Sequence, residues 1–429
     1  MKRSLATFGL WLVVVSIGTQ SVRAQSFGTE LHNTLMPASG GMGGVSIARP
    51  QDVVSALNAN PASITQFRGT QFMFGGGWAE PTFNMTQSAP LPIDSPNPLV
   101  RPYSAKSQAP GTPLGNIGVI QELEEFGLPV TVGVGFLNTA GGFVDFRQVP
   151  ESNGTNTGMA IFNAPMVIGA QLTERLSIGA TTSLGIAFFD GPFVGAGGMT
   201  PDYALRGSLG ANYQLTQFTT VGAYYQTSQN YRFHDAVTIT PIDPTMPKVP
   251  VTVDMNLPQN IGLGLANNAM MDGNLLLAMD ILYKLWNEAA LYQSIYDNQW
   301  VVQLGAQLTQ GKWKYRTGYV WAENPIDPSP DFNIGGVVQP GGYPSVYYTQ
   351  GLLAITSQHR LSFGLGRRDV IPGVDFDLMG GGMFRDEQQL GPATRTSIES
   401  YWLGFGFTWR FNRGAITTPI QSNANVASY

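Results

Sequence analysis

The stretch RLSIGATTSLGIAF, residues 175–188, indicates the fold more clearly than any other part of the chain. Its even-numbered positions are mostly apolar, and most of its odd-numbered positions are small or polar. This period of two is typical of a β-strand with one apolar face. Since a tilted strand of about 10 residues crosses a bilayer, the stretch predicts a membrane strand whose apolar face meets lipid.

Similar alternation recurs along the chain and predicts an all-β, antiparallel transmembrane β-barrel of about 14 strands, an even number that allows closure. Residues 203–215 alternate apolar positions with polar ones, which implies a polar lumen. Short and long connections also alternate, and we expect the short turns in the periplasm and the long loops outside. The predicted strands are 70–79, 115–122, 129–137, 159–172, 175–188, 203–215, 218–232, 251–266, 274–284, 300–309, 312–321, 357–367, 373–384 and 398–411.

Composition favours a membrane barrel over a soluble domain or a helical membrane protein. Only 12% of the 429 residues are charged, whereas soluble domains have about 25%. Beyond the N-terminus no segment has the ~20 consecutive apolar residues that a transmembrane helix needs. The chain has no cysteine, and its formal charge of -5 with no basic face gives no reason to expect a nucleic-acid partner.

The N-terminus has the pattern of a cleaved signal peptide. Lys2 and Arg3 precede an apolar run over 5–17, and Val-Arg-Ala at 22–24 is typical of a cleavage site. A membrane anchor is the alternative, but the run is short for a span. We therefore expect export to the outer membrane of a Gram-negative bacterium. The predicted divisions are a signal peptide (1–24), an N-terminal hatch or plug (25–66), a barrel (67–411) and a polar periplasmic tail (412–429).

Residues 25–66 contain no convincing membrane strand, but they hold the glycine-rich stretch 39–45 and the sequence Asn60-Pro61-Ala62. Such a segment either hangs in the periplasm or folds back into the barrel. Its length and mixed apolar and glycine character favour a plug in the lumen, because glycine permits tight backbone paths. Asn60, Pro61 and Ala62 are then expected near the periplasmic mouth.

Several blocks of sequence resemble the long-chain fatty-acid transporter family, FadL. Residues 52–64 resemble its N-P-A hatch, and three later blocks follow in the family's order, at 257–264, 313–326 and 359–366. The resemblance covers nearly the whole mature chain. It implies a 14-stranded barrel, plugged by an N-terminal hatch, that takes up hydrophobic molecules from outside the cell.

The resemblance also implies a lateral opening in the wall, made by a kink in the third strand, through which ligand leaves into the membrane. Asn138, Gly141 and Gly142 are the expected kink, because adjacent glycines interrupt strand pairing. An ordinary loop beginning at Asn138 is the alternative. The connection 189–202 is shorter than the corresponding loop of the fatty-acid transporters, so the ligand stays open between fatty acids and other apolar compounds.

Four inward positions are candidate ligand contacts. Basic side chains suit a carboxylate headgroup, and the alternative is that they pair with inward acids such as Asp280, Asp375 and Asp377. The candidates are Arg206, Arg316, Arg360 and the aromatic Trp402.

The predicted function is passive transport of hydrophobic compounds across the outer membrane. A general diffusion porin, which would lack a plug, and a structural barrel are the alternatives. A lipase-like enzyme is not expected, because no motif places a nucleophile beside any of the three histidines, and neither a metal nor a cofactor is expected. The expected partners are outer-membrane lipid, an apolar ligand such as a fatty acid or hydrocarbon, and the barrel assembly machinery, with the chain itself a monomer.

Overall fold

A computed structural model describes residues 30–91, 96, 98–124, 127–191, 199–239, 249–330, 332–334, 337–339, 344–353 and 357–411. The predicted signal peptide, 1–24, and the predicted tail, 412–429, lie outside the described residues. Among the residues that are described, no helix is both long and apolar enough to cross a membrane.

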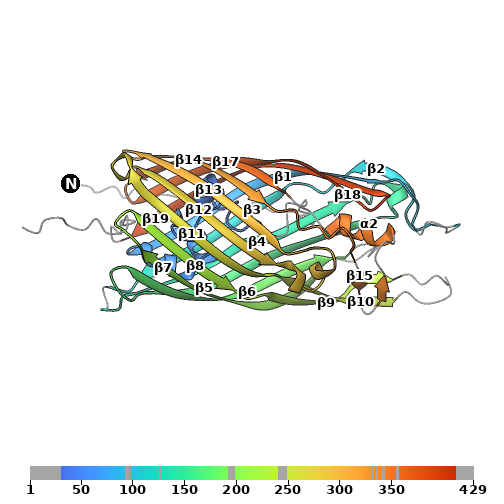
Figure 1. Cartoon of the computed structure of the whole chain (residues 1–429), viewed down its shortest axis with the longest axis horizontal. Coiled ribbons are helices and arrows are strands. Elements are labelled where there is room, and N and C mark those ends of the chain that lie inside the picture. The colour runs from blue at the N-terminus through green and yellow to red at the C-terminus, as the bar shows by residue number, and fades with distance from the viewer. Residues whose placement is uncertain are drawn as a thin grey trace, which may run out of the picture.

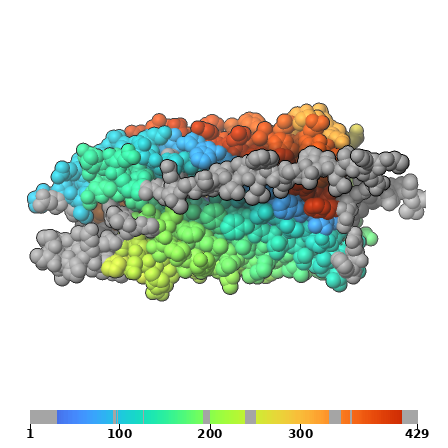
Figure 2. Space-filling model, turned by 180° about the vertical axis from the view of Figure 1, so that it is seen from behind, coloured from blue at the N-terminus to red at the C-terminus, as the bar shows by residue number. Residues whose placement is uncertain are grey.

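Fourteen antiparallel strands form a closed barrel, as the sequence predicted, because the last strand pairs with the first from Thr70↔Phe411 to Gln87↔Thr394. Figure 2 shows this closure on the outer wall, where blue and red parts of the chain meet. In order around the barrel, the strands are β1 (Thr70–Gln87), β3 (Thr112–Glu122), β4 (Val130–Asp145), β5 (Asn156–Gln171), β6 (Leu176–Asp190), β7 (Thr200–Gln214), β8 (Thr219–Gln226), β11 (Gln259–Met270), β12 (Leu275–Leu285), β13 (Gln299–Gln310), β14 (Trp313–Ala322), β17 (His359–Ile371), β18 (Val374–Leu390) and β19 (Thr394–Phe411).

The two ends of the barrel differ in their connections (Figure 1). Short turns join the strands at the end where β1 begins and β19 ends, and we call this the turn end. The opposite, loop end carries the long connections with their additional elements. These are β2 (Tyr103–Lys106), β9 (Gln229–Ile239), β10 (Val249–Leu257), β15 (Phe332–Ile334), β16 (Val337–Gln339), α2 (Pro344–Leu353) and the 3-10 turns η4 (Pro150–Ser152), η6 (Trp286–Glu288) and η7 (Tyr292–Ser294). At the turn end lies η5 (Met271–Gly273).

Two predicted membrane strands are only partly correct, because each combines part of a barrel strand with part of a strand outside the barrel sheet. Residues 218–232 divide into β8 and the start of β9, and 251–266 divide into the end of β10 and β11. Among the described strands, β9 and β10 pair with each other alone, as a hairpin at the loop end that is not part of the barrel sheet. Alternation cannot separate these cases, because a hairpin packed on one face has the same period of two as a strand in the wall.

The outer surface is apolar along most strands. On β7 the predicted lipid-facing residues are largely exposed, with Leu205 at 67% and Leu209 at 64%, whereas the intervening Arg206 is buried. Trp300, Trp313 and Trp321 lie exposed near strand ends, where aromatic girdles of membrane barrels occur. A soluble protein rarely exposes so large an apolar surface, so this outer wall fits a lipid bilayer.

Candidate functional site

The segment of residues 30–66 lies inside the barrel near the turn end (Figure 1, blue). It contains η1 (Ser39–Met42), α1 (Val53–Asn58) and η2 (Pro61–Gln66), and most of its residues are buried. We call it the inner segment. The inner segment corresponds to the predicted hatch, 25–66, without residues 25–29, which lie outside the described residues.

A girdle of wall glycines makes room for the inner segment. A β-carbon added at Gly318 would lie 2.0 Å from the backbone nitrogen of Gly43, and one added at Gly179 would lie 2.4 Å from the backbone of Pro61. Any larger residue there would overlap the inner segment, so these wall positions require glycine. Further glycines whose added β-carbon would meet the inner segment are Gly75, Gly118, Gly133, Gly169, Gly210, Gly222, Gly264, Gly305, Gly364 and Gly406.

Hydrogen bonds fix the inner segment to the wall. The Asp280 carboxylate of β12 accepts from the backbone nitrogens of Ser46 and Ile47 at 2.6 and 2.9 Å. Three strands further round the wall, the Ser362 hydroxyl of β17 accepts from the backbone nitrogen of Gly43 at 3.0 Å. Asp280 thus binds the inner segment and forms no ion pair with a basic side chain among the described residues, contrary to the alternative considered for it.

The Asn60-Pro61-Ala62 corner docks near the turn ends of β6 and β7. The Asn60 amide donates to Asn212 at 2.7 Å and to the Ala211 carbonyl at 3.1 Å, while its own oxygen accepts from Ala62. The Ala62 carbonyl accepts from the Ser177 hydroxyl of β6 at 3.2 Å. This corner therefore ties the inner segment to the wall by both polar contacts and close packing.

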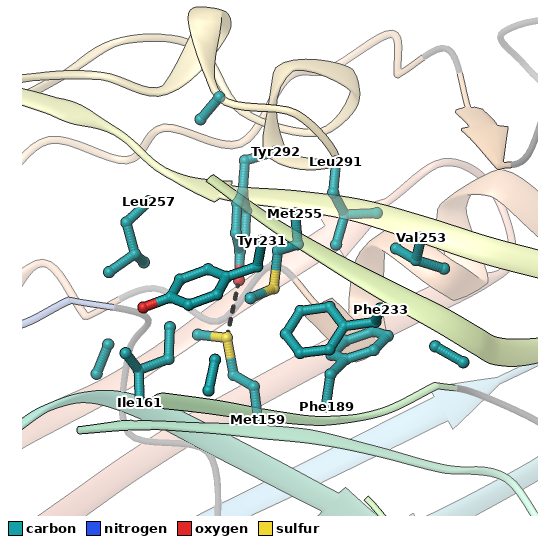
Figure 3. Close-up of a cluster of buried hydrophobic side chains, with 14 of the residues drawn as sticks. Met159, Ile161, Phe189, Tyr231, Phe233, Val253, Met255, Leu257, Leu291 and Tyr292 are labelled. Carbon is teal, nitrogen blue, oxygen red and sulfur yellow. Dashed lines mark hydrogen bonds between the residues drawn. The ribbon is translucent and has the colours of Figure 1, made fainter. Parts of the chain in front are cut away.

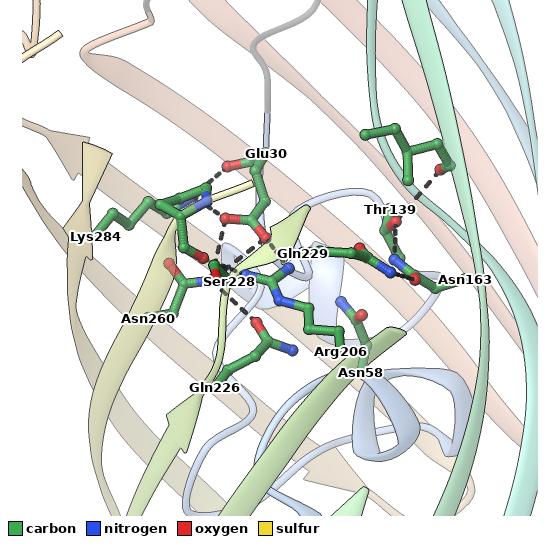
Figure 4. Close-up of polar contacts among 12 residues, drawn as sticks. Glu30, Asn58, Thr139, Asn163, Arg206, Gln226, Ser228, Gln229, Asn260 and Lys284 are labelled. Atoms are coloured by element: carbon green, nitrogen blue, oxygen red, sulfur yellow. Dashed lines mark hydrogen bonds and ion pairs between the residues drawn. The ribbon is translucent and has the colours of Figure 1, made fainter. Parts of the chain in front are cut away.

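Glu30 occupies a polar site made by three strands (Figure 4). Its carboxylate lies 2.7 Å from Arg206 Nη1 on β7 and 3.2 Å from Lys284 Nζ on β12, and it accepts from the Asn260 amide of β11 at 3.1 Å. Burial opposes ionisation of this carboxylate, but Lys284 and Arg206 outweigh burial and lower the pKa of Glu30 to about 2. Glu30 is therefore ionised at physiological pH.

Of the predicted basic contacts, Arg206 has a partner for each of its three guanidinium nitrogens. Besides Glu30, its guanidinium donates to the carbonyls of Thr227 and Pro258. The sequence-based alternative of ion pairing is therefore correct for Arg206, but the partner is Glu30 of the inner segment, which the sequence analysis did not propose. A glutamate six residues into the predicted mature chain offered no periodic signal by which to find it.

Arg316 and Arg360 differ in their partners. Arg316 donates to Asp377 at 2.6 Å and to Gln307 at 2.7 Å, so it too is paired, with an acid that the sequence analysis named. Asp375, the remaining acid named there, accepts from Arg410 at 2.9 Å. Arg360 on β17 is also buried, at 4% exposed, yet it makes no hydrogen bond or ion pair with any of the described residues.

A large apolar cluster fills one side of the lumen at the loop end (Figure 3). The β9–β10 hairpin folds over the wall, so that Tyr231 and Phe233 lie against β6, with Phe233 and Phe189 rings 5.2 Å apart. Tyr292 donates a hydrogen bond to the sulfur of Met159 at 3.4 Å. The cluster extends to Ala140 and Ile161 in the wall and to Met255, Leu257, Trp286 and Val346.

A second apolar cluster includes Trp402, which faces inward from β19, as the sequence predicted, and is 2% exposed. The indole packs over Gly381, where an added β-carbon would lie 2.5 Å from the ring. Tyr103 and Tyr348 join their hydroxyls at 2.8 Å in the same cluster. Aromatic and apolar side chains thus line both sides of the lumen at the loop end.

The wall pairing is interrupted in the third barrel strand, β4. One extra residue stands between Asn138 and Ala140 in the register with β5, which is a β-bulge. Pairing of β4 with β3 stops at Asn116↔Leu137, although β4 runs on to Asp145. An interruption is therefore present from Asn138 onward, and the alternative of a loop beginning at Asn138 is wrong. Gly141 and Gly142, however, pair regularly with Ala160 and Met159 of β5, so the two glycines are not themselves the break in that ladder.

Side chains replace part of the missing backbone pairing at the bulge. The Asn116 side chain accepts from the backbone nitrogen of Asn138 at 3.0 Å, and Asn163 donates to the Thr139 hydroxyl at 2.7 Å. A small polar cavity on the lumen side is lined by Thr139, Arg206 and Glu30, among others. The bulge, the Glu30 site and the inner segment therefore meet at one place.

Comparison with known proteins supports the fold. No family model matches the chain, and no curated protein matches it by sequence. Among solved structures, it is similar to the toluene transporter TodX of Pseudomonas putida, with a TM-score of 0.65 and 17% identity over 89% of this chain and 99% of that one. The fold is FadL-like.

Two further structures agree with this fold. A Pseudomonas aeruginosa FadL homologue has a TM-score of 0.63 at 14% identity, covering 91% of this chain and 100% of that chain. The toluene transporter TbuX of Ralstonia pickettii has a TM-score of 0.60 at 15% identity, with the same coverage. The FadL resemblance predicted from ordered sequence blocks is thereby confirmed for the architecture.

Proposed function

We propose that this protein is an outer-membrane transporter for hydrophobic compounds, with residues 25–66 as its plug. The known proteins of the same fold include transporters of toluene and a FadL homologue. The inner segment crosses the lumen near the turn end, which we assign to the periplasm because short turns face that side in such barrels. The apolar outer wall would be in contact with the lipid of the outer membrane.

The observation that carries the proposal is the continuity between the apolar cluster and the interrupted wall. Ala140 in the β4 bulge and its neighbour Ile161 both belong to the cluster that fills the loop end. An apolar solute held there would lie next to the unpaired edge of β4. We propose that it leaves sideways into the membrane by diffusion, with no energy source.

The alternatives from other classes have less support. A general diffusion porin needs an open lumen. In this protein the described inner segment contacts wall glycines on most strands around the barrel. For enzyme function, the buried His32 lies beside Ser46, with 3.4 Å between its ring nitrogen and the hydroxyl. Burial is the main cause that lowers the pKa of His32 to about 3, far below the range of a useful general base at neutral pH.

Replacing Gly141 and Gly142 by valine tests the lateral exit. Valine favours continuous strand pairing, and a β-carbon at Gly141 lies 3.1 Å from the Met159 carbonyl, a contact that a small shift relieves. We expect uptake of a hydrocarbon by cells that depend on this protein to fall at least about tenfold, or ~1.4 kcal/mol in the barrier to passage.

Gly207→Val is the matched control, because Gly207 lies in a continuous strand. A β-carbon added there would be 3.8 Å from its nearest neighbour, the Thr227 side chain. Heat-modifiable migration on gels shows in both variants that the barrel has folded. Wild-type uptake by the folded double variant would rule out an exit at this stretch.

A further inference from the structure

Glu30 raises a question of specificity, because it fills a site that the barrel wall builds for a carboxylate. Arg206, Lys284 and Asn260 come from three different strands, and all three donate to the same carboxylate. Arginine, lysine and amide donors converging on one point are the usual receptor for a carboxylate. The ligand of this receptor is supplied by the chain itself.

Every donor nitrogen of the receptor already has a partner. The remaining Arg206 nitrogens donate to backbone carbonyls at Thr227 and Pro258, and Lys284 also donates to the Glu30 carbonyl. The side chains of Arg206, Lys284 and Glu30 are 4%, 3% and 9% exposed, respectively. A carboxylate arriving through the lumen would therefore have to displace Glu30 or be buried beside it as a like charge, which is costly.

Displacement is unfavourable because Glu30 is tethered. A group on the same chain acts at an effective concentration of the order of millimolar or more, and the inner segment holds Glu30 in place by its many wall contacts. A free carboxylated molecule at lower concentration competes poorly for the same donors. An uncharged molecule does not need these donors and is unaffected.

We infer that Glu30 is a specificity-determining residue that keeps carboxylated molecules from binding in the lumen, so that the transported ligand is an uncharged hydrocarbon or ester. The inference rests on the proposed function and narrows its ligand class. It also corrects the role expected of Arg206, which serves the internal pair and not a ligand headgroup. Arg360, the buried cation without a hydrogen-bond partner among the described residues, acts on Lys284 through its charge but donates no hydrogen bond to Glu30, and it provides an internal comparison.

The test compares dodecanoate with methyl dodecanoate, which have the same chain and differ in charge. Binding of each radiolabelled probe is measured with the purified full chain in nanodiscs, and empty nanodiscs correct for partitioning into lipid. For the wild type we expect the ester to bind about tenfold or more tightly than the acid. Glu30→Ala, which vacates the receptor, should tighten acid binding about tenfold and leave ester binding unchanged.

Two variants control for charge and position. Glu30→Asp keeps a carboxylate and should retain the wild-type preference for the ester. Arg360→Gln removes a cation outside the receptor and should not tighten acid binding. Unchanged ester binding by Glu30→Ala also shows that its lumen is intact, which separates a loss of selectivity from a loss of structure.

The outcomes are distinct. Equal affinity of the wild type for acid and ester, or an unchanged acid affinity in Glu30→Ala with ester binding intact, would overturn the role of Glu30 while leaving the proposed transport function standing. Failure of the wild type to bind either probe above empty nanodiscs would instead contradict the proposed function, and the inference with it.

Discussion

The turn end and the loop end of the lumen are filled by opposite means. At the turn end the wall contributes glycine, and the inner segment contributes backbone that passes within contact distance of it. At the loop end the wall and its loops contribute large side chains, such as Tyr231, Phe233 and Trp402. One end is closed by a piece of chain that fits a fixed wall, whereas the other is closed by side chains.

This difference indicates how each end responds to change. Backbone packed on glycine has no rotatable atoms to move aside, so the fit at the turn end depends on shape and on hydrogen bonds such as those of Asp280 and Asn60. Large apolar side chains can change rotamer and leave or fill space. We therefore expect the turn end to be fixed and the loop end to adapt to the ligand.

The largest expected effect follows deletion of residues 25–66 behind an intact signal peptide. If the inner segment is what closes the lumen, single-channel conductance in planar bilayers should rise from near zero to that of an open barrel. Conductance equal to that of the full chain would show that the loop-end cluster closes the barrel by itself, and the contrast between the two ends would be wrong.

Gly318→Val should give the next largest effect. Its β-carbon overlaps the backbone of Gly43, which cannot move aside as a side chain would, and overpacking of this kind costs about 1–3 kcal/mol or more. We expect the inner segment to detach from β13 and β14, seen as intermittent channel openings and as faster protease cleavage within residues 30–66. Gly207→Val, on the outer face, should show neither change.

Much of the fold was predictable from sequence because a lipid-facing strand must alternate. Residues 175–188 and 203–215 carry this pattern in the wall, and both are strands with the predicted faces. The β9–β10 hairpin was missed for the same reason, since residues 229–239 and 249–257 also alternate, but toward the apolar cluster. Period alone does not state what the apolar face meets.

The site was less predictable, because its partners are distant in sequence. Asn138 was recognisable beside paired glycines, and Asn60 through a family block. Glu30 pairs with Arg206 across 176 positions, and no local pattern connects them. The glycine girdle accounts for part of the 52 glycines of the chain, and this role becomes visible only once the path of the inner segment is known.

Phe233→Ala tests the adaptable loop end. Phe233 is fully buried between Phe189 and Tyr231, and truncating a core phenylalanine costs about 3–5 kcal/mol in a rigid core. If neighbouring side chains adapt, the barrel should unfold in urea with a loss of less than about 2 kcal/mol, and binding of a bulky hydrocarbon should tighten relative to a small one. A full-sized loss of stability with unchanged ligand preference would mean that this end is as rigid as the other.

Asp52→Asn should give the smallest effect, confined to the fit of the inner segment. One Asp52 oxygen caps α1 by accepting from Ser55 at 2.7 Å, and the other accepts from Ala38 and Ser39, both at 2.8 Å. Asparagine keeps one acceptor but turns an NH₂ group toward backbone donors on the other side, which should cost about 1–2 kcal/mol.

Because these bonds lie within the inner segment and not between it and the wall, we expect the barrel's urea midpoint and resting conductance to stay unchanged. Hydrogen exchange of the amides of residues 38, 39 and 55 should accelerate about tenfold, corresponding to ~1.4 kcal/mol of local stability. Channel openings as frequent as in Gly318→Val would show that the internal fold of the inner segment, and not its contact with glycine, is what closes the turn end.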